Sequence, residues 1–327
     1  QLSMTSTDME LEMIATLPVA VEKEGKTTVS ARKFLDICRA LPNNATISFK
    51  AQDNKAIVRA GKSRFSLATL PAEDFPDSEG ANYVDEISLP QSALKSLLDE
   101  TSFAMASQDV RYYLNGLLLE REDTTLRAVA TDGHRLALGS ITTNTSVAEK
   151  NNIIIPRKAI MELGRLLNDT DDTVKLAFSS QQIKVELPDL HFTSKLIDGQ
   201  FPNYQRVLPL GGDKIVLANR EELKQALSRA AILSNDKHRS VRINLEAGLF
   251  KATVTNQEQE VAEEEITVDY QGTSLEIAFN NAYLLDLLNA IPDDQVKMVF
   301  TDDNSSVLIT PADEKLERQY VVMPMRL

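Results

Sequence analysis

The fold is decided by the stretch Ala31-Arg32-Lys33-Phe34-Leu35-Asp36-Ile37-Cys38-Arg39-Ala40-Leu41. Its apolar residues recur at intervals of three and four, so that Phe34, Ile37 and Leu41 fall on one face of a helix. The cationic side chains decorate the rest of that helix. This pattern predicts an amphipathic helix over residues 31–41 with a positively charged outer face.

Similar helices return twice later in the chain. The second runs over 156–167 and carries three cations, and the third runs over 280–290 and carries none. Their first residues, Ala31, Pro156 and Asn280, lie 125 and 124 residues apart. A period of this size is that of a domain, so we expect three related units.

Strand-like runs follow each of these helices. Phe65, Phe192 and Tyr320 occupy matching places in the last run of each group and lie 127 and 128 residues apart, which agrees with the helix spacing. A second type of helix opens the two later units, at 90–106 and at 219–233, where Asn219 is a suitable N-cap. The predicted fold class is therefore α+β, with helices and antiparallel sheets repeated in three domains. The expected strands are 46–50, 55–60 and 64–70, then 174–178, 182–187 and 191–196, then 296–301, 305–310 and 318–323.

We place the domains at 1–82, 83–209 and 210–327, because the polar segments 76–82 and 209–213 are rich in turn-forming residues. The first unit is short. Only 64 residues separate Gln1 from Phe65, whereas 98 separate Leu94 from Phe192 in the second unit. We therefore expect the first domain to lack about one helix and its adjoining strand. Its opening residues, 1–14 and 19–21, alternate as in a strand.

The composition is that of a globular protein, with 43% hydrophobic and 25% charged residues. A net charge of -13 argues against a protein coated in nucleic acid, although one internal surface can still be basic. Cys38 is the single cysteine, which excludes a disulfide framework and favours a reducing cytoplasm. Apolar runs fall far short of the ~20 residues that cross a bilayer. We expect a cytoplasmic protein without a membrane segment.

The sequence lacks the common catalytic patterns. It has no Gly-rich phosphate loop, no paired Cys or His at metal spacing and no Gly-x-Ser-x-Gly elbow. Asp132 and His134 could serve a hydrolase, but no partner Ser or Cys motif accompanies them. We expect a protein without catalytic residues, metal or cofactor, and keep the hydrolase as the alternative.

Four motifs then indicate a family. They are Asp109-Val110-Arg111-Tyr112-Tyr113-Leu114-Asn115-Gly116, Ala130-Thr131-Asp132-Gly133-His134-Arg135-Leu136-Ala137, Asp198-Gly199-Gln200-Phe201-Pro202-Asn203-Tyr204 and Tyr320-Val321-Val322-Met323-Pro324-Met325-Arg326-Leu327. With these motifs, the sequence strongly resembles the bacterial DNA sliding clamp, the beta subunit of DNA polymerase III, over essentially the whole chain. The resemblance implies a non-enzymatic processivity factor in which two subunits form a ring around duplex DNA, with helices lining the inner face and sheets forming the outer shell. Such a ring contacts phosphates without sequence specificity.

The helices and the resemblance together give candidate DNA-facing residues. The resemblance adds one glutamine and two tyrosines to the helical cations, while ordinary solvated helix charge remains the alternative for any single cation. The candidates are Arg32, Lys33, Arg39, Lys95, Gln108, Tyr112, Tyr113, Arg157, Lys158, Arg165, Arg220, Lys224 and Arg229.

The resemblance also implies a partner pocket between the second and third domains. There the catalytic subunit of polymerase III, the clamp loader, and other polymerases and repair proteins would insert a short, largely hydrophobic peptide. Arg135 and Arg206 could fix polar groups at its rim, and His238 replaces the expected aromatic residue, which predicts a more polar wall. Taken alone, the C-terminal tail would read as a core strand with a frayed tip. The matching residues are Leu114, Thr131, Gly133, His134, Arg135, Leu136, Pro202, Arg206, Val207, His238, Asn280, Tyr283, Ser306, Val321, Val322, Met323, Pro324, Met325, Arg326 and Leu327.

Ring closure would be a homodimer contact in which the first domain of one subunit pairs edge to edge with the third domain of the other. Opposite charges on the two edges favour this head-to-tail register. A DNA-binding protein with an open groove is the second alternative. The interface candidates are Lys62, Arg64 and Phe65 on one edge, and Ile232, Leu233, Glu260, Glu263 and Glu264 on the other.

Overall fold

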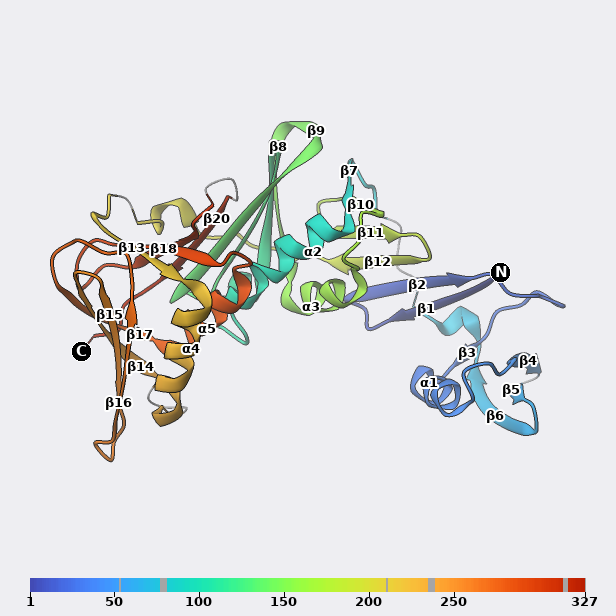
Figure 1. Cartoon of the computed structure of the whole chain (residues 1–327). Helices are drawn as coiled ribbons and strands as arrows, with labels where there is room; N and C mark the ends of the chain where they lie inside the picture. The colour runs from blue at the N-terminus through green and yellow to red at the C-terminus, as the bar shows by residue number, and fades with distance from the viewer. Residues whose placement is uncertain (53, 77–80, 210, 235–238, 314–316, 327) are drawn as a thin grey trace. The chain divides into compact units, whose positions relative to one another are not determined.

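The computed structural model describes residues 1–52, 54–76, 81–209, 211–234, 239–313 and 317–326 (Figure 1). The described chain consists of helices and antiparallel strands in repeated groups, which confirms the α+β prediction. It divides into two compact units. The first contains Gln1–Asn82 with Lys184–Thr193, and the second contains Tyr83–Ile183 with Ser194–Leu327.

The first unit holds the predicted cationic helix, α1, packed on a small sheet. Ser30 caps the helix by accepting a hydrogen bond from the Lys33 N–H. Phe34 and Ile37 pack against the buried residues of strands β5 and β6, so the stripe read from the sequence is the packing face. The sheet has the order β3-β6-β5-β4. Its elements are β3 (Thr28–Val29), α1 (Ala31–Ala40), β4 (Ser48–Gln52), β5 (Lys55–Ala60) and β6 (Ser63–Leu70), followed by a short 3-10 helix (Ala72–Asp74).

The opening of the chain differs from the prediction. Instead of one continued strand, it forms a hairpin of β1 (Leu2–Thr7) and β2 (Leu11–Leu17). The Asp8 carboxylate accepts hydrogen bonds from the N–H groups of Glu10 and Leu11, and Met9 takes a φ of 76°. The alternating sequence pattern correctly predicts strand structure here. It does not show where the chain reverses, because the turn is made by the Asp8 side chain. The Thr16 N–H donates to Asp189 O, so β2 joins the returning segment of this unit.

The second unit begins with a repeat built around a long hairpin. Strands β8 (Gly116–Thr131) and β9 (Arg135–Pro156) pair along most of their length, with a register irregularity near Asp123. Helices α2 and α3 pack beside this hairpin. The other elements of this repeat in the second unit are β7 (Asp85–Pro90), α2 (Gln91–Asp99), α3 (Arg157–Leu166) and β10 (Thr173–Phe178). The strands that follow, β11 (Gln182–Leu187) and β12 (Leu190–Lys195), lie largely in the first unit, which contains Lys184–Thr193.

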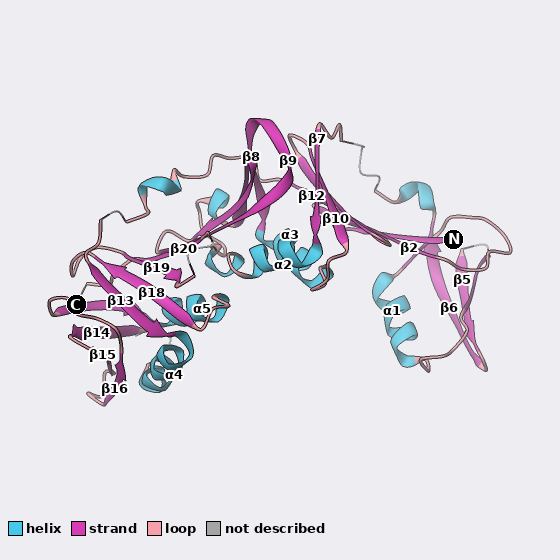
Figure 2. Ribbon diagram, turned by 45° about the horizontal axis from the view of Figure 1, so that its top comes forward, coloured by secondary structure: helices cyan, strands magenta, loops and turns pink. Residues whose placement is uncertain are grey.

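The next repeat contributes a four-stranded sheet of order β16-β15-β14-β17 and three strands that continue the long hairpin. The continued sheet has the order β13-β18-β19-β20-β9-β8, in which β20 of one repeat pairs with β9 of the other. Figure 2 shows helices α2 to α5 along one side of this unit and the strands along the other. The elements are β13 (Lys214–Asn219), α4 (Arg220–Ala230), β14 (Ser240–Glu246), β15 (Leu249–Thr255), β16 (Val261–Thr267), β17 (Leu275–Asn280), α5 (Asn281–Ala290), β18 (Gln295–Phe300), β19 (Val307–Pro311) and β20 (Arg318–Val322).

The second type of helix is shorter than expected. The segment predicted over 90–106 is helical only to Asp99 and then becomes a 3-10 turn at Ser102–Ala104. The Thr101 hydroxyl donates to Leu97 O at 2.6 Å, and this local bond competes with continuation of the helix. The later helix likewise ends at Ala230, although Asn219 caps its start as predicted.

A buried ion pair ties the two repeats of the second unit together. Arg318 on β20 contacts the Glu100 carboxylate beyond α2, and both side chains are at least nine-tenths buried. The same guanidinium donates to Ser140 O on β9 at 2.6 Å. Because both charges are almost fully removed from water, each needs the other as its counter-ion.

We expect Arg318→Met to lower the free energy of unfolding by about 3–5 kcal/mol, because it leaves the Glu100 carboxylate buried without its counter-ion. Arg242→Met is the matched control. It breaks an exposed pair with Glu276 at 3.0 Å and should cost less than about 1 kcal/mol. Urea unfolding at one fixed protein concentration measures both, and equal losses would contradict the assignment.

Candidate functional site

The residues predicted for the partner pocket converge where β20 meets β9. Val321 lies opposite Leu136 and Val322 opposite Arg135 in the antiparallel register. The pairing continues past the strand, since the Met323 N–H donates to His134 O at 2.9 Å. The C-terminal tail and the start of β9 therefore lie side by side in the site.

The floor of this site is apolar. Leu136 and Val321 belong to one buried cluster together with Tyr204, and the half-buried Val207 and Leu208 pack against it. These residues come from β9, β20 and the segment around the 3-10 helix Tyr204–Arg206. A hydrophobic floor assembled from three separate segments fits an apolar ligand group.

Arg135 is more deeply engaged than the sequence suggested. Its guanidinium carbon lies 4.4 Å from the ring centroid of Tyr283, and it pairs with Asp132 at 3.1 Å and Asp286 at 2.6 Å. A further donor contacts Phe103 O at 2.9 Å. Arg135 thus braces the wall of the site by linking α5 to the β8–β9 turn, and its donors are directed to these groups instead of an open rim.

The β8–β9 turn is fixed by its own polar groups. The Asp132 carboxylate accepts hydrogen bonds from the N–H groups of His134 and Arg135, and Gly133 takes a φ of 88°. The Thr131 hydroxyl donates to Arg135 O and accepts from the Gly133 N–H. Asp132 therefore acts as a turn-stabilising residue, which is a simpler account of this motif than hydrolase chemistry.

The remaining pocket candidates lie around this centre. Leu114 is buried, Asn280 caps α5, and Ser306 directly precedes β19, which pairs with β20. The Met325 N–H donates to Ala278 O at 2.7 Å and holds the tail against β17. Two candidates, His238 and Leu327, lie outside the described residues. Those on the exposed side of the site are Pro202, Arg206, Met323, Met325 and Arg326, with Pro324 half-buried between them.

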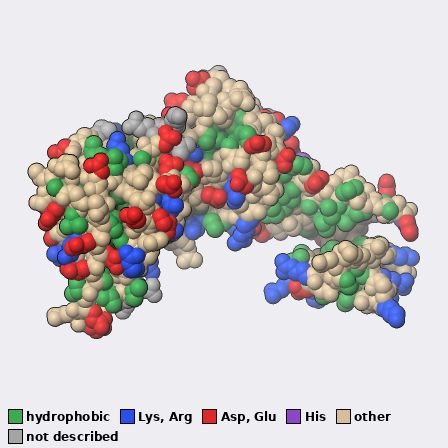
Figure 3. Space-filling model, viewed as in Figure 1, with side chains coloured by type: hydrophobic (Ala, Val, Ile, Leu, Met, Phe, Trp, Pro, Cys, Tyr) green, Lys and Arg blue, Asp and Glu red, His purple; other side chains and the backbone are tan. Residues whose placement is uncertain are grey.

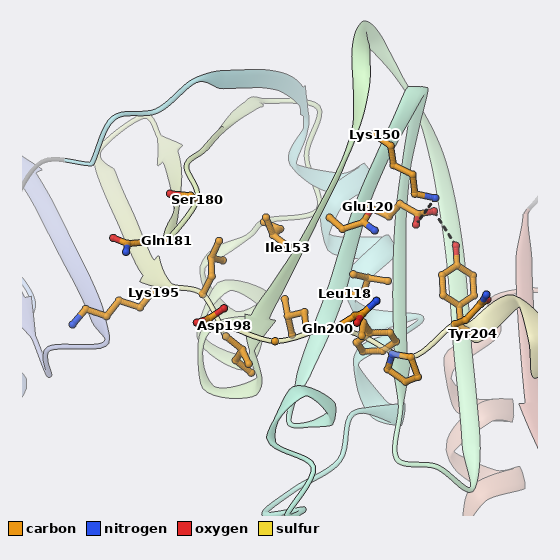
Figure 4. A pocket seen from close by; sticks show the side chains of 18 of the residues that line it. Leu118, Glu120, Lys150, Ile153, Ser180, Gln181, Lys195, Asp198, Gln200 and Tyr204 are labelled. Atoms are coloured by element: carbon orange, nitrogen blue, oxygen red, sulfur yellow. Dashed lines mark hydrogen bonds and ion pairs between the residues drawn. The ribbon is translucent and has the colours of Figure 1, made fainter.

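Behind the pocket segment lies a cavity of about 980 Å³ (Figure 4). Glu120 on β8 is buried at its edge, where its carboxylate accepts from the Tyr204 hydroxyl at 2.8 Å and pairs with Lys150 at 2.8 Å. Arg127 contacts the same carboxylate. Burial alone would raise the pKa of Glu120, but the bonds from Lys150, Tyr204 and Arg127 outweigh it and hold the pKa below its ordinary value.

The candidate DNA-facing cations differ in how freely they present charge. On α1, Arg32, Lys33 and Arg39 are exposed and form no ion pair within the described ranges, and Figure 3 shows Lys and Arg side chains gathered over this helix. Lys158 and Arg165 are exposed on α3, where Arg165 also pairs with Glu162 at 2.7 Å. Gln108 and Tyr112 are also exposed, and Tyr113 is half-buried against Tyr112.

Other candidate cations are already engaged within the fold. Arg220 donates to the carbonyls of Asp293 and Leu288, and Arg157 donates to Met105 O. Arg229 forms a two-point pair with Glu264. These side chains serve structural contacts, which leaves less of their charge for phosphate. Lys95 pairs with Asp99 at 3.3 Å and Lys224 with Glu221 at 3.7 Å.

The two edges proposed for subunit contact are both sheet edges in the described structure. Strand β16 pairs only with β15, and β6 pairs with β3 only at its last two residues. Ile232, beside the acidic edge, exposes 77% of its surface. Glu263 pairs with Lys251 and Glu264 with Arg229, so the acidic edge is partly neutralised within the subunit.

Comparison with known proteins agrees with this architecture. Three models of the DNA polymerase III beta subunit match in order: the N-terminal domain at residues 1–79, the central domain at 88–203 and the C-terminal domain at 205–326. The beta sliding clamp of Pseudomonas putida is 51% identical over the whole chain and 89% of the relative, and that of Escherichia coli K12 is 49% identical with the same coverage. This chain belongs to the beta sliding clamp family.

Solved clamps have the same fold. A Pseudomonas aeruginosa clamp with ligand superposes with a TM-score of 0.96 at 49% identity, covering 99% of this chain and 89% of the other. A second P. aeruginosa clamp, bound to griselimycin, gives a TM-score of 0.95 at 49% identity over 99% of this chain and 88% of the other. The family resemblance seen in the sequence and the three-domain clamp fold are thereby confirmed, and the function is that of a DNA sliding clamp, an accessory subunit in replication.

Two further observations concern the described residues of this clamp. They contain no cluster of three or more His, Cys, Asp or Glu side chains arranged to hold a metal ion. Within the same ranges, none of the helices is long and apolar enough to cross a bilayer.

Sequence reasoning missed the polar support of the clamp's pocket. Glu120 ends the apolar run Leu117-Leu118-Leu119, and a lone carboxylate in a buried strand is the only local signal. Its partner Tyr204 is 84 residues away, so nothing in the sequence joins them.

The low pKa of Glu120 predicts a pH-dependent contribution to stability. Because the folded-state pKa lies below that of the unfolded chain, the ionised carboxylate stabilises the clamp above the ordinary glutamate pKa of about 4.3. This contribution is lost as the pH falls. Glu120→Gln should therefore lower the free energy of unfolding by about 1–3 kcal/mol at pH 7. The gap from wild type, measured by urea unfolding, should narrow near pH 4; a constant gap would count against this account.

Proposed function

We propose that the chain forms a homodimeric ring that encircles duplex DNA and tethers replication proteins through the β9–β20 pocket. The observation that carries this proposal is the match to beta sliding clamps along the whole chain. We also propose that the chain requires no cofactor. A protein that serves the bacterial chromosome would work in the cytoplasm.

The proposed peptide site is the apolar floor of Leu136, Val207 and Val321 with its two walls. One wall is the tail through Met325, and the other is the segment that carries Pro202 and Arg206. Two related solved structures, from P. aeruginosa and Bartonella birtlesii, are clamps bound to griselimycin. We propose that this chain binds the same compound, and that the peptides of its protein partners use the same floor. Those partners are the polymerase III catalytic subunit, the clamp loader, and other polymerases and repair proteins.

The proposed DNA surface is the helical side of each domain. The exposed cations of α1 would meet phosphates, joined by the exposed side chains of Lys158 and Arg165 on α3. Non-specific contact of this kind permits sliding. Helix α5 carries no Lys or Arg, so the positive lining is uneven. Tethering then raises the effective concentration of a bound polymerase near its template.

For ring closure we propose that β6 of one subunit pairs with β16 of its partner. Strand β16 is the edge of its sheet, and β6 has a free side except at its last two residues, where β3 pairs with it. Free strand sides of this kind favour strand addition. Lys62 and Arg64 on the first edge complement Glu260 and Glu263 on the second. The exposed Ile232 would be covered at this contact.

Topology separates a ring from a groove binder. After loading by a clamp loader, the protein should stay on nicked circular DNA. It should dissociate before the DNA elutes once the DNA is linearised, because a ring slides off free ends. Gel filtration of labelled protein with each DNA measures this. Equal loss from circular and linear DNA would support the open-groove alternative.

The dimer contact has its own test. Ile232→Ala combined with Leu233→Ala should convert the native mass from that of a dimer to that of a 36.3 kDa monomer, since it removes apolar surface from the proposed interface. Native mass spectrometry gives the readout. Val110→Ala, at a side chain 95% exposed and away from this edge, is the control and should remain dimeric. A dimeric double variant would place the interface elsewhere.

A further inference from the structure

The pocket wall that carries Pro202, Arg206 and Val207 is backed by open space. Residues 195–205 line the 980 Å³ cavity along their whole length, facing Leu118, Glu120 and Ile153 of the long hairpin across it (Figure 4). A segment over a cavity has few packing partners on that side. Its position must therefore depend on a small number of attachments.

Hydrogen bonds attach the two ends of this segment, and at its start the Leu196 N–H donates to Gln181 O at 2.9 Å. Two further bonds join the segment to the long hairpin. At one end the Ile197 N–H donates to Ile154 O at 2.9 Å, and at the other the Tyr204 hydroxyl donates to Glu120 at 2.8 Å. Between them, residues 198–203, all of which are described, make no hydrogen bond to the hairpin. Phe201 adds an apolar contact to the floor cluster.

The Tyr204 end lies closest to the proposed ligand. The Tyr204 ring is in the same buried cluster as Leu136 and Val321. Tyr204 is also the first residue of the short 3-10 helix that ends at Arg206. The Val207 N–H donates to Tyr204 O at 2.9 Å. A shift of this ring would therefore move both the floor and the wall.

Glu120 is well suited to hold the ring in one place. A buried carboxylate is an acceptor only, so the Tyr204 hydroxyl must donate to it, and a bond to a charged acceptor is stronger than one between neutral groups. Lys150 and Arg127 compensate the carboxylate, and Arg127 also lies 3.4 Å from the phenol oxygen. The cluster has enough donors to keep Glu120 ionised without releasing Tyr204.

We propose that Glu120 and Tyr204 are positioning residues of the clamp's peptide pocket. Their hydrogen bond fixes the wall of Pro202, Arg206 and Val207 in its binding position before a partner arrives, which lowers the ordering cost of binding. This inference rests on the pocket assigned under the proposed function.

Tyr204→Phe tests the proposal because it removes one oxygen and keeps the ring. Tyr270→Phe is the matched control. Tyr270 is equally buried in another part of the second unit, and its hydroxyl donates to Thr273 O away from the pocket. Griselimycin is the probe, with its affinity for the full chain measured by calorimetry. Tyr204→Phe should bind it about five- to tenfold more weakly, and Tyr270→Phe as wild type, although both lose stability.

A double-variant cycle and amide exchange sharpen the result. Adding Glu120→Gln to Tyr204→Phe should weaken griselimycin binding no further, because the hydrogen bond is already absent. Amide exchange at residues 198–207 should quicken in Tyr204→Phe while β20 stays protected.

Unchanged affinity and unchanged exchange in Tyr204→Phe, with the stability loss of the control, would overturn the positioning role alone. Failure of the wild-type protein to bind griselimycin would instead overturn the pocket assignment, and the positioning role with it. The two failures are therefore distinguishable.

Discussion

The pairing of β20 with β9 is the constraint on which the functional part of the molecule depends. It joins two repeats into one continuous sheet and places Val321 beside Leu136 on the pocket floor. Two arginines brace it at opposite ends of the ladder. Arg318 of β20 reaches Glu100 in the preceding repeat, and Arg135 of β9 reaches Asp286 in the following one. Because these contacts cross in opposite directions, neither repeat can shift without breaking a charged pair.

The repeats contain similar helices, and the differences between α1 and α5 show how one repeated element can serve different functions. Helix α1 keeps exposed cations over a small packing face. Helix α5, at the corresponding place in the last repeat, has no cation and instead offers Tyr283 and Asp286 to Arg135. The side chains of α5 therefore support Arg135 at the proposed pocket instead of presenting positive charge. The acidic net charge is compatible with this division, since charge on one helix face matters locally and not as an average.

Much of the fold could be read from periodicity, because helices and strands bury one face each. All five predicted helices and the three-strand groups are present, and their bounds agree with the predictions to within a few residues except at the end of α2. The errors have local causes that periodicity does not contain: an Asp8 turn split the first strand, and the Thr101 hydroxyl ended a helix early. Family resemblance identified the candidate pocket residues, but it did not identify the buried polar residues that support them. Contacts such as that of Glu120 with Tyr204 join positions 84 residues apart, and no periodic pattern in the sequence relates them.

The pocket combines a fixed floor with an adaptable rim. Its floor residues are buried among three segments, and its walls are held by charged groups in defined geometry. At the rim, Met323 and Met325 are 38% and 40% exposed, and methionine side chains can rearrange to fit different apolar surfaces. If a peptide binds at the proposed site, the rigid floor would select where it anchors, while the flexible rim would tolerate different residues around the anchor. Recognition of several partners at the proposed site would then follow from the arrangement that holds β20 against β9, because the site is rigid where the two repeats meet and adaptable where the chain leaves the sheet.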